Sequence, residues 1–282
     1  MPFSVQTTVR LTCTTFLLMC LSTRALFADV IVTRLANGGV ILSDGQSTSV
    51  MIDGMVTTPF SIYAGLPDDA RDKFFKAIGP FLGIDLALVS HQHHQHNQPD
   101  TACAFLRHSP DTVFASSSQV IDLVREKCRD YVTTSKNVQI IDPQYDQPVT
   151  LHAGDATVTV FLLSHGHGRN STIVNFGHLV EIGGMKVLHV GGADMDPTDF
   201  ARAGVDKMNI DVALVPFLFY EPGPGPAVVA TYLNSPHQIA EQIPPDEMAD
   251  VKSYLQVEYP QVLILENALE QVRFTAPSRT LQ

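Results

Sequence analysis

Three apolar segments of this sequence lead into histidine or aspartate, and this repeated pattern constrains the fold more than any other feature. Asp85–Val89 leads into Ser90-His91-Gln92-His93-His94-Gln95-His96-Asn97, and a second segment leads into Ser164-His165-Gly166-His167-Gly168-Arg169. A third leads into His189-Val190-Gly191-Gly192-Ala193-Asp194. Short, continuously apolar runs are typical of strands buried on both faces of a sheet. Because functional side chains gather in strand-end loops, the pattern predicts one polar site built from several strands.

The predicted elements follow the same order in both halves of the chain. Short β-rich runs at 30–35, 39–42 and 49–52 are separated by Asn-Gly and Asp-Gly turns, and helices and strands then alternate to residue 141. A second β-rich block runs from 149 to 190, and Asp211–Pro216 is a further buried strand. The pattern predicts one α/β (α+β) domain, a four-layer αββα sandwich of two facing sheets with helices outside. The Pro/Gly-rich run Glu221–Pro226 is expected to be an exposed loop.

The first 28 residues read as a signal peptide that precedes a single domain at 29–282. Arg10 is followed by the mostly apolar run Leu11–Leu21, which is too short for a transmembrane helix, so no stable membrane anchor is expected. A buried N-terminal helix is the alternative. Removal of this segment leaves Cys103 and Cys128, which an oxidising compartment would permit to pair if the fold brings them together. We therefore expect a periplasmic or secreted protein.

The charge of the chain argues against nucleic acid as a partner. Asp and Glu number 29 against 18 Lys and Arg, which gives a formal net charge of -11. A surface of that sign repels phosphate backbones. We therefore expect a small-molecule substrate.

The histidine cluster after Val89 predicts a metal site. Imidazole is a good ligand for a borderline metal ion, and a tight turn can bring His91 and His93 to one ion while His96 faces a neighbouring point. A solvated histidine-rich loop is the alternative, because some loops carry such tracts by composition alone. The further histidine and aspartate at two other predicted strand ends favour the metal site.

These motifs resemble the metallo-β-lactamase superfamily of metal-dependent hydrolases. The superfamily signature is His-x-His-x-Asp-His after a strand, then a downstream His, an Asp in a Gly-Asp step and a last His, and the resemblance extends from about Val30 to about Leu265. It includes the turn Met51-Ile52-Asp53-Gly54, and the string 175–191 is similar to the branch that contains ascorbate-phosphate lactonase. The resemblance implies the metallo-β-lactamase fold, with zinc held by His91, His93 and His165 and a second metal position at His96.

The chain departs from the superfamily pattern at the other ligands of the second metal. Gln95 occupies the position of the motif Asp, Gly192 that of the Asp in the Gly-Asp step, and Gln242 that of the last His. The replacements bind metal weakly or not at all. One zinc ion is therefore expected, and binding of a second stays open.

Several side chains near these positions are candidates to replace the missing metal ligands. Asp194 is a candidate ligand and a candidate catalytic base, although it and Asp196 are also suited to capping the helix that starts at Pro197. Gln95 occupies the position of the motif Asp, which in relatives holds the attacking water and helps to deprotonate it. The amide of Gln95 cannot accept a proton at neutral pH. Arg169 is a candidate for binding a carboxylate or phosphate group of the substrate, with exposure to water as the alternative. Glu241 and His167 are weaker ligand candidates; a solvent-facing side chain is the alternative for Glu241, and a plain loop position is the alternative for His167.

The sequence thus predicts a metal-dependent hydrolase that acts on a small ester, lactone or phosphoester. In the superfamily the ion polarises the scissile carbonyl or phosphoryl oxygen and lowers the pKa of its water. The alternative is a non-catalytic member of the fold that binds a ligand or partner, with one structural metal or none. A fold of this kind hosts many chemistries, so the resemblance implies fold and ligands more closely than substrate.

Overall fold

Two seven-stranded sheets form the centre of the protein in this computed structural model, which describes residues 29–275. The first sheet has the order β14-β1-β2-β3-β4-β5-β6, with β14 Gln271–Phe274, β1 Val30–Arg34, β2 Val40–Ser43, β3 Ser49–Ile52, β4 Leu86–Leu88, β5 Val113–Ser116 and β6 Val138–Ile140. The second has the order β13-β12-β11-β10-β9-β8-β7, with β13 Val262–Ile264, β12 His237–Glu241, β11 Val212–Pro216, β10 Met185–His189, β9 Phe176–Ile182, β8 Ala156–Leu162 and β7 Val149–Ala153.

Each sheet combines an antiparallel part with a parallel part. Strands β1–β3 and β7–β10 pair as antiparallel meanders, whereas β3–β6 and β10–β13 pair in parallel. Parallel pairing requires long crossover connections, which are helical here because a helix can cover the apolar outer face of the sheet. The internal similarity predicted from the sequence is therefore present in the structure.

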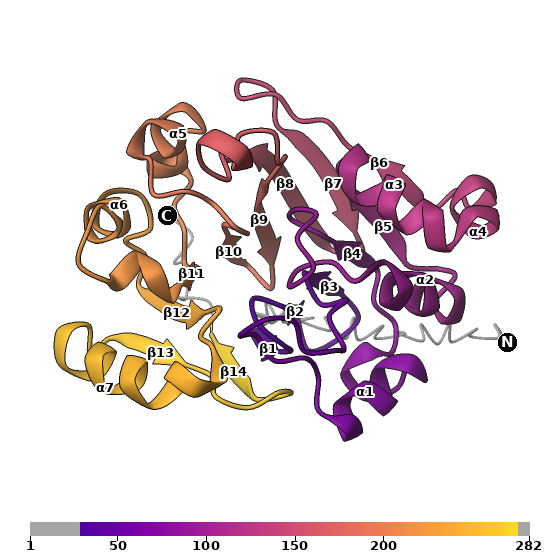
Figure 1. Cartoon of the computed structure of the whole chain (residues 1–282), viewed down its shortest axis with the longest axis horizontal. Coiled ribbons are helices and arrows are strands. Elements are labelled where there is room, and N and C mark those ends of the chain that lie inside the picture. The colour runs from indigo at the N-terminus through magenta and orange to yellow at the C-terminus, as the bar shows by residue number, and fades with distance from the viewer. Residues whose placement is uncertain (1–28, 276–282) are drawn as a thin grey trace, which may run out of the picture.

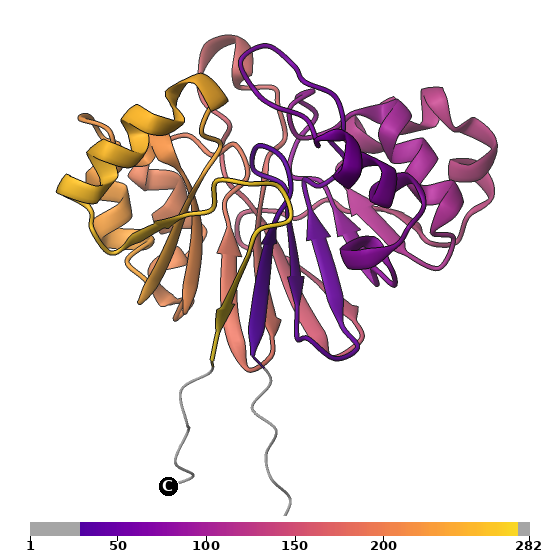
Figure 2. The ribbon, with the colours of Figure 1, turned by 90° about the horizontal axis from the view of Figure 1, so that it is seen from below.

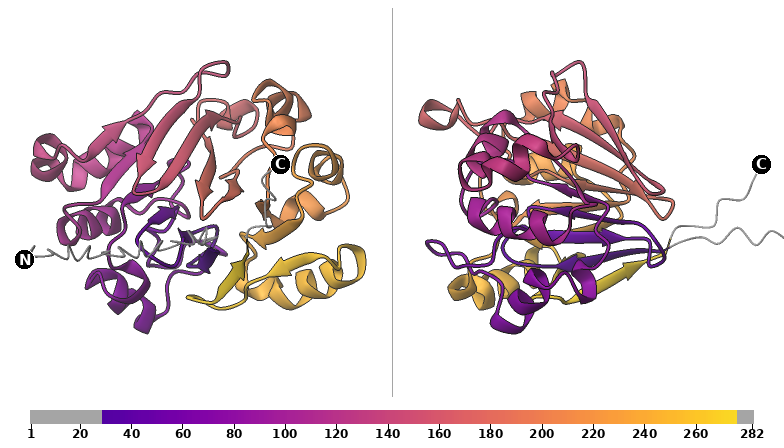
Figure 3. Two further views of the ribbon diagram at one scale, coloured as in Figure 1. Left: turned by 180° about the vertical axis from the view of Figure 1, so that it is seen from behind. Right: turned by 90° about the vertical axis from the view of Figure 1, so that its right-hand side faces the viewer.

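The helices divide between the two outer faces of the sandwich. Helices α1 Asp68–Phe75, α2 Pro99–His108, α3 Ser118–Lys127 and α4 Arg129–Thr134 accompany the first sheet, and α5 Pro197–Arg202, α6 Gly225–Tyr232 and α7 Met248–Glu258 accompany the second (Figure 1). Short 3-10 turns occupy Gly79–Phe81 (η1), Gly168–Asn170 (η2), Val205–Lys207 (η3), Phe217–Tyr220 (η4) and Pro245–Glu247 (η5). The view from behind in Figure 3 shows the purple and magenta helices opposite the orange and yellow ones.

Three apolar clusters hold these layers together. Alternate residues of both sheets, such as Val32 and Val180, are buried between the sheets. A second cluster, with Phe74 and Phe105, fills the space under the helices of the first sheet, and a third, with Phe200 and Tyr220, does the same for the second sheet. The layer order is therefore helix, sheet, sheet, helix, and the predicted four-layer sandwich is confirmed.

The expected loop at Glu221–Pro226 is shorter than predicted. Residues 221–224 are exposed, but α6 begins at Gly225, with Pro226 in its first turn. Proline is tolerated there because the first backbone N–H groups of a helix have no partner within the helix. A Cβ at Gly225 would lie 2.4 Å from the backbone oxygen of Phe219, so glycine permits the close approach of α6 to η4.

The expected signal peptide, residues 1–28, lies outside the described residues. Among residues 29–275, none of the helices is both long enough and apolar enough to span a bilayer.

Cys103 on α2 and Cys128 after α3 form a disulfide, with their Cα atoms 5.4 Å apart. Both sulfur atoms lie in the apolar layer beside the first sheet, where Cys128 is buried. The sequence left this pairing open, and the packing of α2 on α3 now brings the two residues together.

We expect reduction of Cys103–Cys128 to destabilise the protein. The bond closes a loop with a sequence separation of 25 residues, and constraining the unfolded chain in this way contributes about 2 to 4 kcal/mol. Thermal unfolding with and without reductant, compared with a Cys103→Ala/Cys128→Ala double variant, measures the effect. The reduced wild type and the double variant should melt together, clearly below the oxidised protein. An oxidised protein that melts with them would contradict the expectation.

Candidate metal centre

Loops that follow strands of both sheets form the candidate site. His91 and His93 follow β4, His165 follows β8, and Gly192 follows β10. Figure 2 shows the loops rising at one edge of the sandwich, between the two helical layers. Because β3–β5 and β10–β12 are parallel, their carboxyl ends meet at this edge, where ligands of α/β proteins commonly bind.

Three imidazoles converge at this edge. One ring nitrogen from each of His91, His93 and His165 lies within 4.8 Å of the other two. The Nε2 atom of His165 is 2.8 Å from the Nδ1 atom of His93, so the two rings share one hydrogen bond. Among residues 29–275, no other group of three or more His, Cys, Asp or Glu side chains meets this distance limit.

Asp53 and Ser90 fix the ring of His91. The Ser90 hydroxyl is 2.6 Å from Asp53 Oδ2, an ionised carboxylate oxygen, and therefore donates to it. The same hydroxyl oxygen then accepts from Nδ1 of His91, at 2.9 Å. A proton on Nδ1 leaves the lone pair of Nε2 free. That Nε2 atom is buried and has no hydrogen-bond partner among the described residues.

The Asp53 carboxylate also orients His96. Asp53 Oδ2 accepts from Nδ1 of His96 at 2.7 Å, while Oδ1 accepts from the backbone N–H of Ser90 at 2.6 Å. Burial by itself would raise the pKa of Asp53, but the neighbouring His96 and the donors of Ser90 outweigh it and hold the pKa at about 2. A carboxylate that orients imidazoles in this way is a usual partner of metal-binding histidines.

The local environment keeps the three imidazoles neutral. Burial, followed by repulsion from His96 and His165, lowers the pKa of His91 well below its usual value. Burial, followed by His93, lowers the pKa of His165 to about 4. Burial also lowers the pKa of His93. At neutral pH each ring therefore carries a lone pair, which is the form that binds a metal ion.

These observations fit a metal ion. Three neutral imidazoles converge, and one of them presents a buried lone pair to which no protein group donates. An unsatisfied buried polar atom carries a free-energy cost that coordination to an ion would remove. Three imidazole nitrogens are a donor set found in catalytic zinc sites, which leave a further position open.

Gly192 packs against the histidine group without room for a side chain. A Cβ atom there would lie 2.7 Å from Cε1 of His91 and 3.0 Å from Cε1 of His165. The Gly192 backbone N–H donates to Oδ1 of Asn175 at 2.8 Å. Gly192 thus faces the site through its backbone alone.

Gln242 reaches back toward the same loop. Its Nε2 donates to the backbone oxygen of Gly191 at 2.9 Å, and its side chain covers Gly38. The neighbouring Glu241, for which solvent exposure was one interpretation, is buried, with Oε2 3.5 Å from Nε2 of His189. Burial raises the pKa of the Glu241 carboxyl. The interpretation of Glu241 as a solvent-facing residue is therefore wrong.

Asp194 lies at the rim of the site. Its Oδ2 is 3.6 Å from Nε2 of His167, and its Oδ1 accepts from the backbone N–H of Met195. Asp196, not Asp194, caps α5 by accepting from the N–H of Thr198. Asp194 and His96 lie outside the group of three mutually close ligands, and their assignment as ligands stays a prediction.

The other two predicted site residues, Gln95 and Arg169, lie in the loops that carry the histidines. Gln95 is partly buried between His94 and His96, and its backbone oxygen accepts from the side chain of Asn37. Arg169 is exposed on η2, in the loop that carries His165. Both positions are consistent with contact to a substrate, and their roles also stay predictions.

His178 and His189 are core residues. They are paired across β9 and β10 and are fully buried. Nε2 of His189 donates to the backbone oxygen of Gly38, and its Nδ1 accepts from the N–H of Gly191. His189 thereby links the turn after β1 to the glycine loop of the site. Burial lowers the pKa of His178 to about 3.

Comparison with known proteins identifies the family. The model of a family described as "Beta-lactamase superfamily domain" matches residues 69–249. The chain belongs to this superfamily. The matched region contains the histidine loop, His165 and Gln242, and Asp53 lies before it. A search of curated proteins found no match.

Solved structures described as metal-dependent hydrolases share this fold at low sequence identity. A possible metal-dependent hydrolase from Veillonella parvula DSM 2008 is 15% identical, with a TM-score of 0.60, over 87% of this chain and 99% of that chain. Igni18, a metallo hydrolase from Ignicoccus hospitalis KIN4/I, is 16% identical, with a TM-score of 0.56, over 87% of this chain and 98% of that chain. The predicted metallo-β-lactamase fold is thus confirmed.

A third similar structure is described as a diiron enzyme. CmlA from Streptomyces venezuelae, a diiron β-hydroxylase, is 15% identical, with a TM-score of 0.53, over 88% of this chain and 54% of that chain. At this identity the likeness concerns the fold alone. The fold and the histidine group indicate a metal ion, and they leave its identity open.

Proposed function

We propose that this protein is a periplasmic or secreted hydrolase that uses one zinc ion to cleave a small ester, lactone or phosphoester. The observation that carries the proposal is the convergence of His91, His93 and His165, with the lone pair of His91 Nε2 buried and unpartnered. An ion bound there would polarise a carbonyl or phosphoryl oxygen and make water available as a nucleophile near neutral pH. Zinc is favoured because three neutral imidazoles are a donor set that it accepts.

Side chains around the histidine group have distinct roles in this proposal. Asp53 and Ser90 hold His91 in the tautomer that presents Nε2, and they are positioning residues. Asp194 accepts a proton at the rim, because its Oδ2 has only the exposed His167 nearby. Arg169 binds a carboxylate or phosphate group of the substrate. Gln95 donates its amide N–H to the substrate or to water, since an amide cannot act as the base at neutral pH.

One ion, and not two, is proposed because side chains suited to a second are missing. Gly192 offers no donor atom, and Gln242 uses its amide on the Gly191 backbone. His96 keeps a free Nε2, but among the described residues no group of three ligands includes it. The sequence string at 175–191 resembles the branch that contains ascorbate-phosphate lactonase, so lactones and phosphoesters are the first substrates to test.

The residues Gly192 and Gln242, which stand at ligand positions of the superfamily, favour a second candidate function. The protein would then be a non-catalytic member that binds a ligand and holds a structural metal or none. The occupation of the Gly191 carbonyl by Gln242 supports it, because this contact closes the loop with a neutral amide and not with a ligand.

Metal analysis combined with a substrate panel separates the two functions. We expect about one zinc ion per chain and turnover of at least one class among chromogenic esters, lactones, phosphodiesters and a β-lactam. Chelation should abolish the turnover and added zinc should restore it, while a His165→Ala variant should stay inactive. Bound zinc without any turnover would support the non-catalytic function. Turnover that survives chelation would contradict the proposed metal-dependent hydrolase function.

Export of the protein is proposed from the apolar run near its N-terminus and from its disulfide. Disulfides such as Cys103–Cys128 persist mainly in oxidising compartments. We expect a mature chain that starts near Asp29. N-terminal sequencing of the secreted or periplasmic fraction checks this, and a chain that retains Met1 there would show that the segment is not cleaved.

A further inference from the structure

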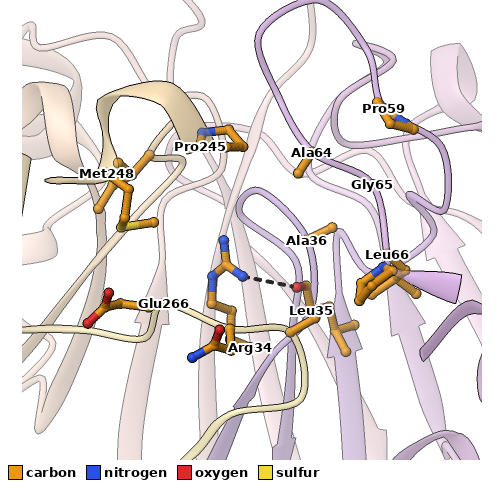
Figure 4. Close-up of a pocket in the computed structure, with 14 residues that line it drawn as sticks. Arg34, Leu35, Ala36, Pro59, Ala64, Gly65, Leu66, Pro245, Met248 and Glu266 are labelled. Carbon is orange, nitrogen blue, oxygen red and sulfur yellow. Dashed lines mark hydrogen bonds between the residues drawn. The ribbon is translucent and has the colours of Figure 1, made fainter. Parts of the chain in front are cut away.

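A pocket separate from the histidine group lies between the two halves of the sandwich. It has a volume of about 500 Å³ and is bounded by the end of β1, the loop after β3, and the segments around η5 and before β14. Most of its wall is apolar, with Leu66, Ile243 and Met248 among the lining residues. The lining residues are drawn in Figure 4.

Arg34 brings a positive charge into this apolar pocket. Figure 4 shows its guanidinium pointing into the space between Met248, Pro245 and Ala64. The side chain is partly buried, and its one hydrogen bond, to the backbone oxygen of Leu35, is long at 3.5 Å. A guanidinium has five N–H donors, so most of them have no hydrogen-bond partner among the described residues. Among residues 29–275, no carboxylate lies within 4.0 Å of this guanidinium.

The two nearest acidic residues have other partners. Glu266 lines the pocket, but its carboxylate is paired with Lys252 and points away from Arg34 in Figure 4. Oε2 of Glu270 accepts the backbone N–H groups of Glu266 and Asn267, at 2.8 and 2.9 Å. Burial lowers the pKa of Arg34, against the opposing effect of Glu270. Arg34 is therefore a partly desolvated cation without an ion-pair partner, an arrangement that an added anion would stabilise.

We propose that this pocket binds a small organic acid, with its carboxylate on Arg34 and its apolar body against Leu66, Ile243 and Met248. The planar guanidinium matches a carboxylate, since two parallel N–H donors reach both oxygens. A monoanion fits better than a dianion because Glu266 and Glu270 add negative charge around the pocket. The volume is within the lower range of small-molecule sites and leaves ample room for a body of about six carbon atoms. The site does not require hydrolytic activity, so its test is independent of the function proposed above.

Hexanoate, its neutral analogue hexanamide, and hexyl phosphate are the probes for this pocket. Each is titrated to about 10 mM into the wild type, Arg34→Met, Arg34→Lys and, as a matched control, Arg125→Met, while backbone amide NMR signals are followed. Arg125 is an exposed arginine on α3, paired with Asp122 and remote from the pocket. Assigned shifts at Ala36, Ala64 and Ala268, which line the pocket, locate the binding.

We expect hexanoate to shift these amides and to bind at least about tenfold more tightly than hexanamide, since hydrogen bonds between ionised groups are shorter and stronger than those to a neutral amide. Hexyl phosphate should bind more weakly than hexanoate. Arg34→Met should lose the preference for hexanoate, Arg34→Lys should keep part of it, and Arg125→Met should match the wild type. The proposal would be overturned by equal affinities for hexanoate and hexanamide, by equal or tighter binding of hexyl phosphate, or by the absence of shifts at these residues. If Arg34→Met does not fold, the comparison of hexanoate with hexanamide in the wild type still tests the proposal.

Discussion

Replacing His91 with alanine is expected to remove nearly all bound metal from the purified protein. His91 supplies the only buried, unpartnered ring nitrogen of the three-histidine group, so its loss removes the ligand that the fold orients most closely. Changes to residues behind metal ligands usually cost 10 to 100-fold in affinity, so loss of the ligand itself should cost more than about 100-fold. Metal content by mass spectrometry after dialysis measures the effect.

The stability of the His91→Ala variant separates metal binding from packing. A ligand present at about 100 times its dissociation constant stabilises the folded state by about 2.7 kcal/mol. The wild type should therefore melt at a lower temperature after chelation, whereas the variant should not respond. His94→Ala is the matched control, because His94 is exposed in the same loop and packs on Phe60. If His91→Ala retained the metal content of His94→Ala, the ion would have to bind elsewhere. His165→Ala tests the same claim at a second ligand, which is less buried than His91.

Adding a single methyl group at Gly192 is also expected to disrupt the centre. The new Cβ would lie 2.7 Å from Cε1 of His91, whose ring cannot easily move because Ser90 and Asp53 hold its other side. Inserting a methyl group into a packed site typically costs about 1 to 3 kcal/mol. We therefore expect Gly192→Ala to bind metal at least about tenfold more weakly, a loss of about 1.4 kcal/mol. Metal titration followed by the melting temperature measures both effects.

Gly204→Ala is the control for Gly192→Ala. It adds the same methyl group into open space before η3, at a backbone φ of 68°, so it strains the backbone without touching the histidines. It should lower stability and leave metal affinity unchanged. Unchanged metal affinity in Gly192→Ala would mean that the ion is held away from the His91 ring. The same collision predicts that Gly192→Asp, alone or with Gln95→Asp and Gln242→His, does not rebuild a second metal site without movement of His91.

The general plan of this fold is readable from the sequence because its strands are short, apolar and separated by clear turns. The runs at 30–35, 49–52 and 85–89 match β1, β3 and β4 closely. His91, His93 and His165 were identified for a related reason: each follows such a run directly. A strand end fixes where its next few residues lie, so the convergence of the three loops follows from the packing of the two sheets.

Features that depend on contacts between residues far apart in the sequence could not be predicted from such local patterns. Asp53 was noted only as part of a turn, yet it holds both Ser90 and His96 across 37 and 43 residues. Its backbone φ of 50°, which non-glycine residues rarely adopt, fits the Asp-Gly step that could have marked it. The pairing of β14 with β1 joins the first and last strands of the described chain, and Glu241 is buried beside His189, which is 52 residues earlier in the sequence. Local patterns carry no signal for such contacts.

The difference between Gln95 and Asp194 shows the limit of motif reasoning at the site itself. Gln95 lies in the loop that carries His91 and His93, whereas Asp194 lies two residues beyond Gly192 and beside His167 in the structure. Their roles depend on where the substrate binds, which side-chain positions alone do not define.

The most direct test of the central claim is anomalous X-ray diffraction at the zinc absorption edge from crystals grown with zinc. The account predicts one strong peak within about 2.0 to 2.1 Å of a ring nitrogen of each of His91, His93 and His165. The peak should be absent from His91→Ala crystals. A zinc peak away from these three histidines would contradict the account. So would the absence of a zinc peak from wild-type crystals grown with zinc.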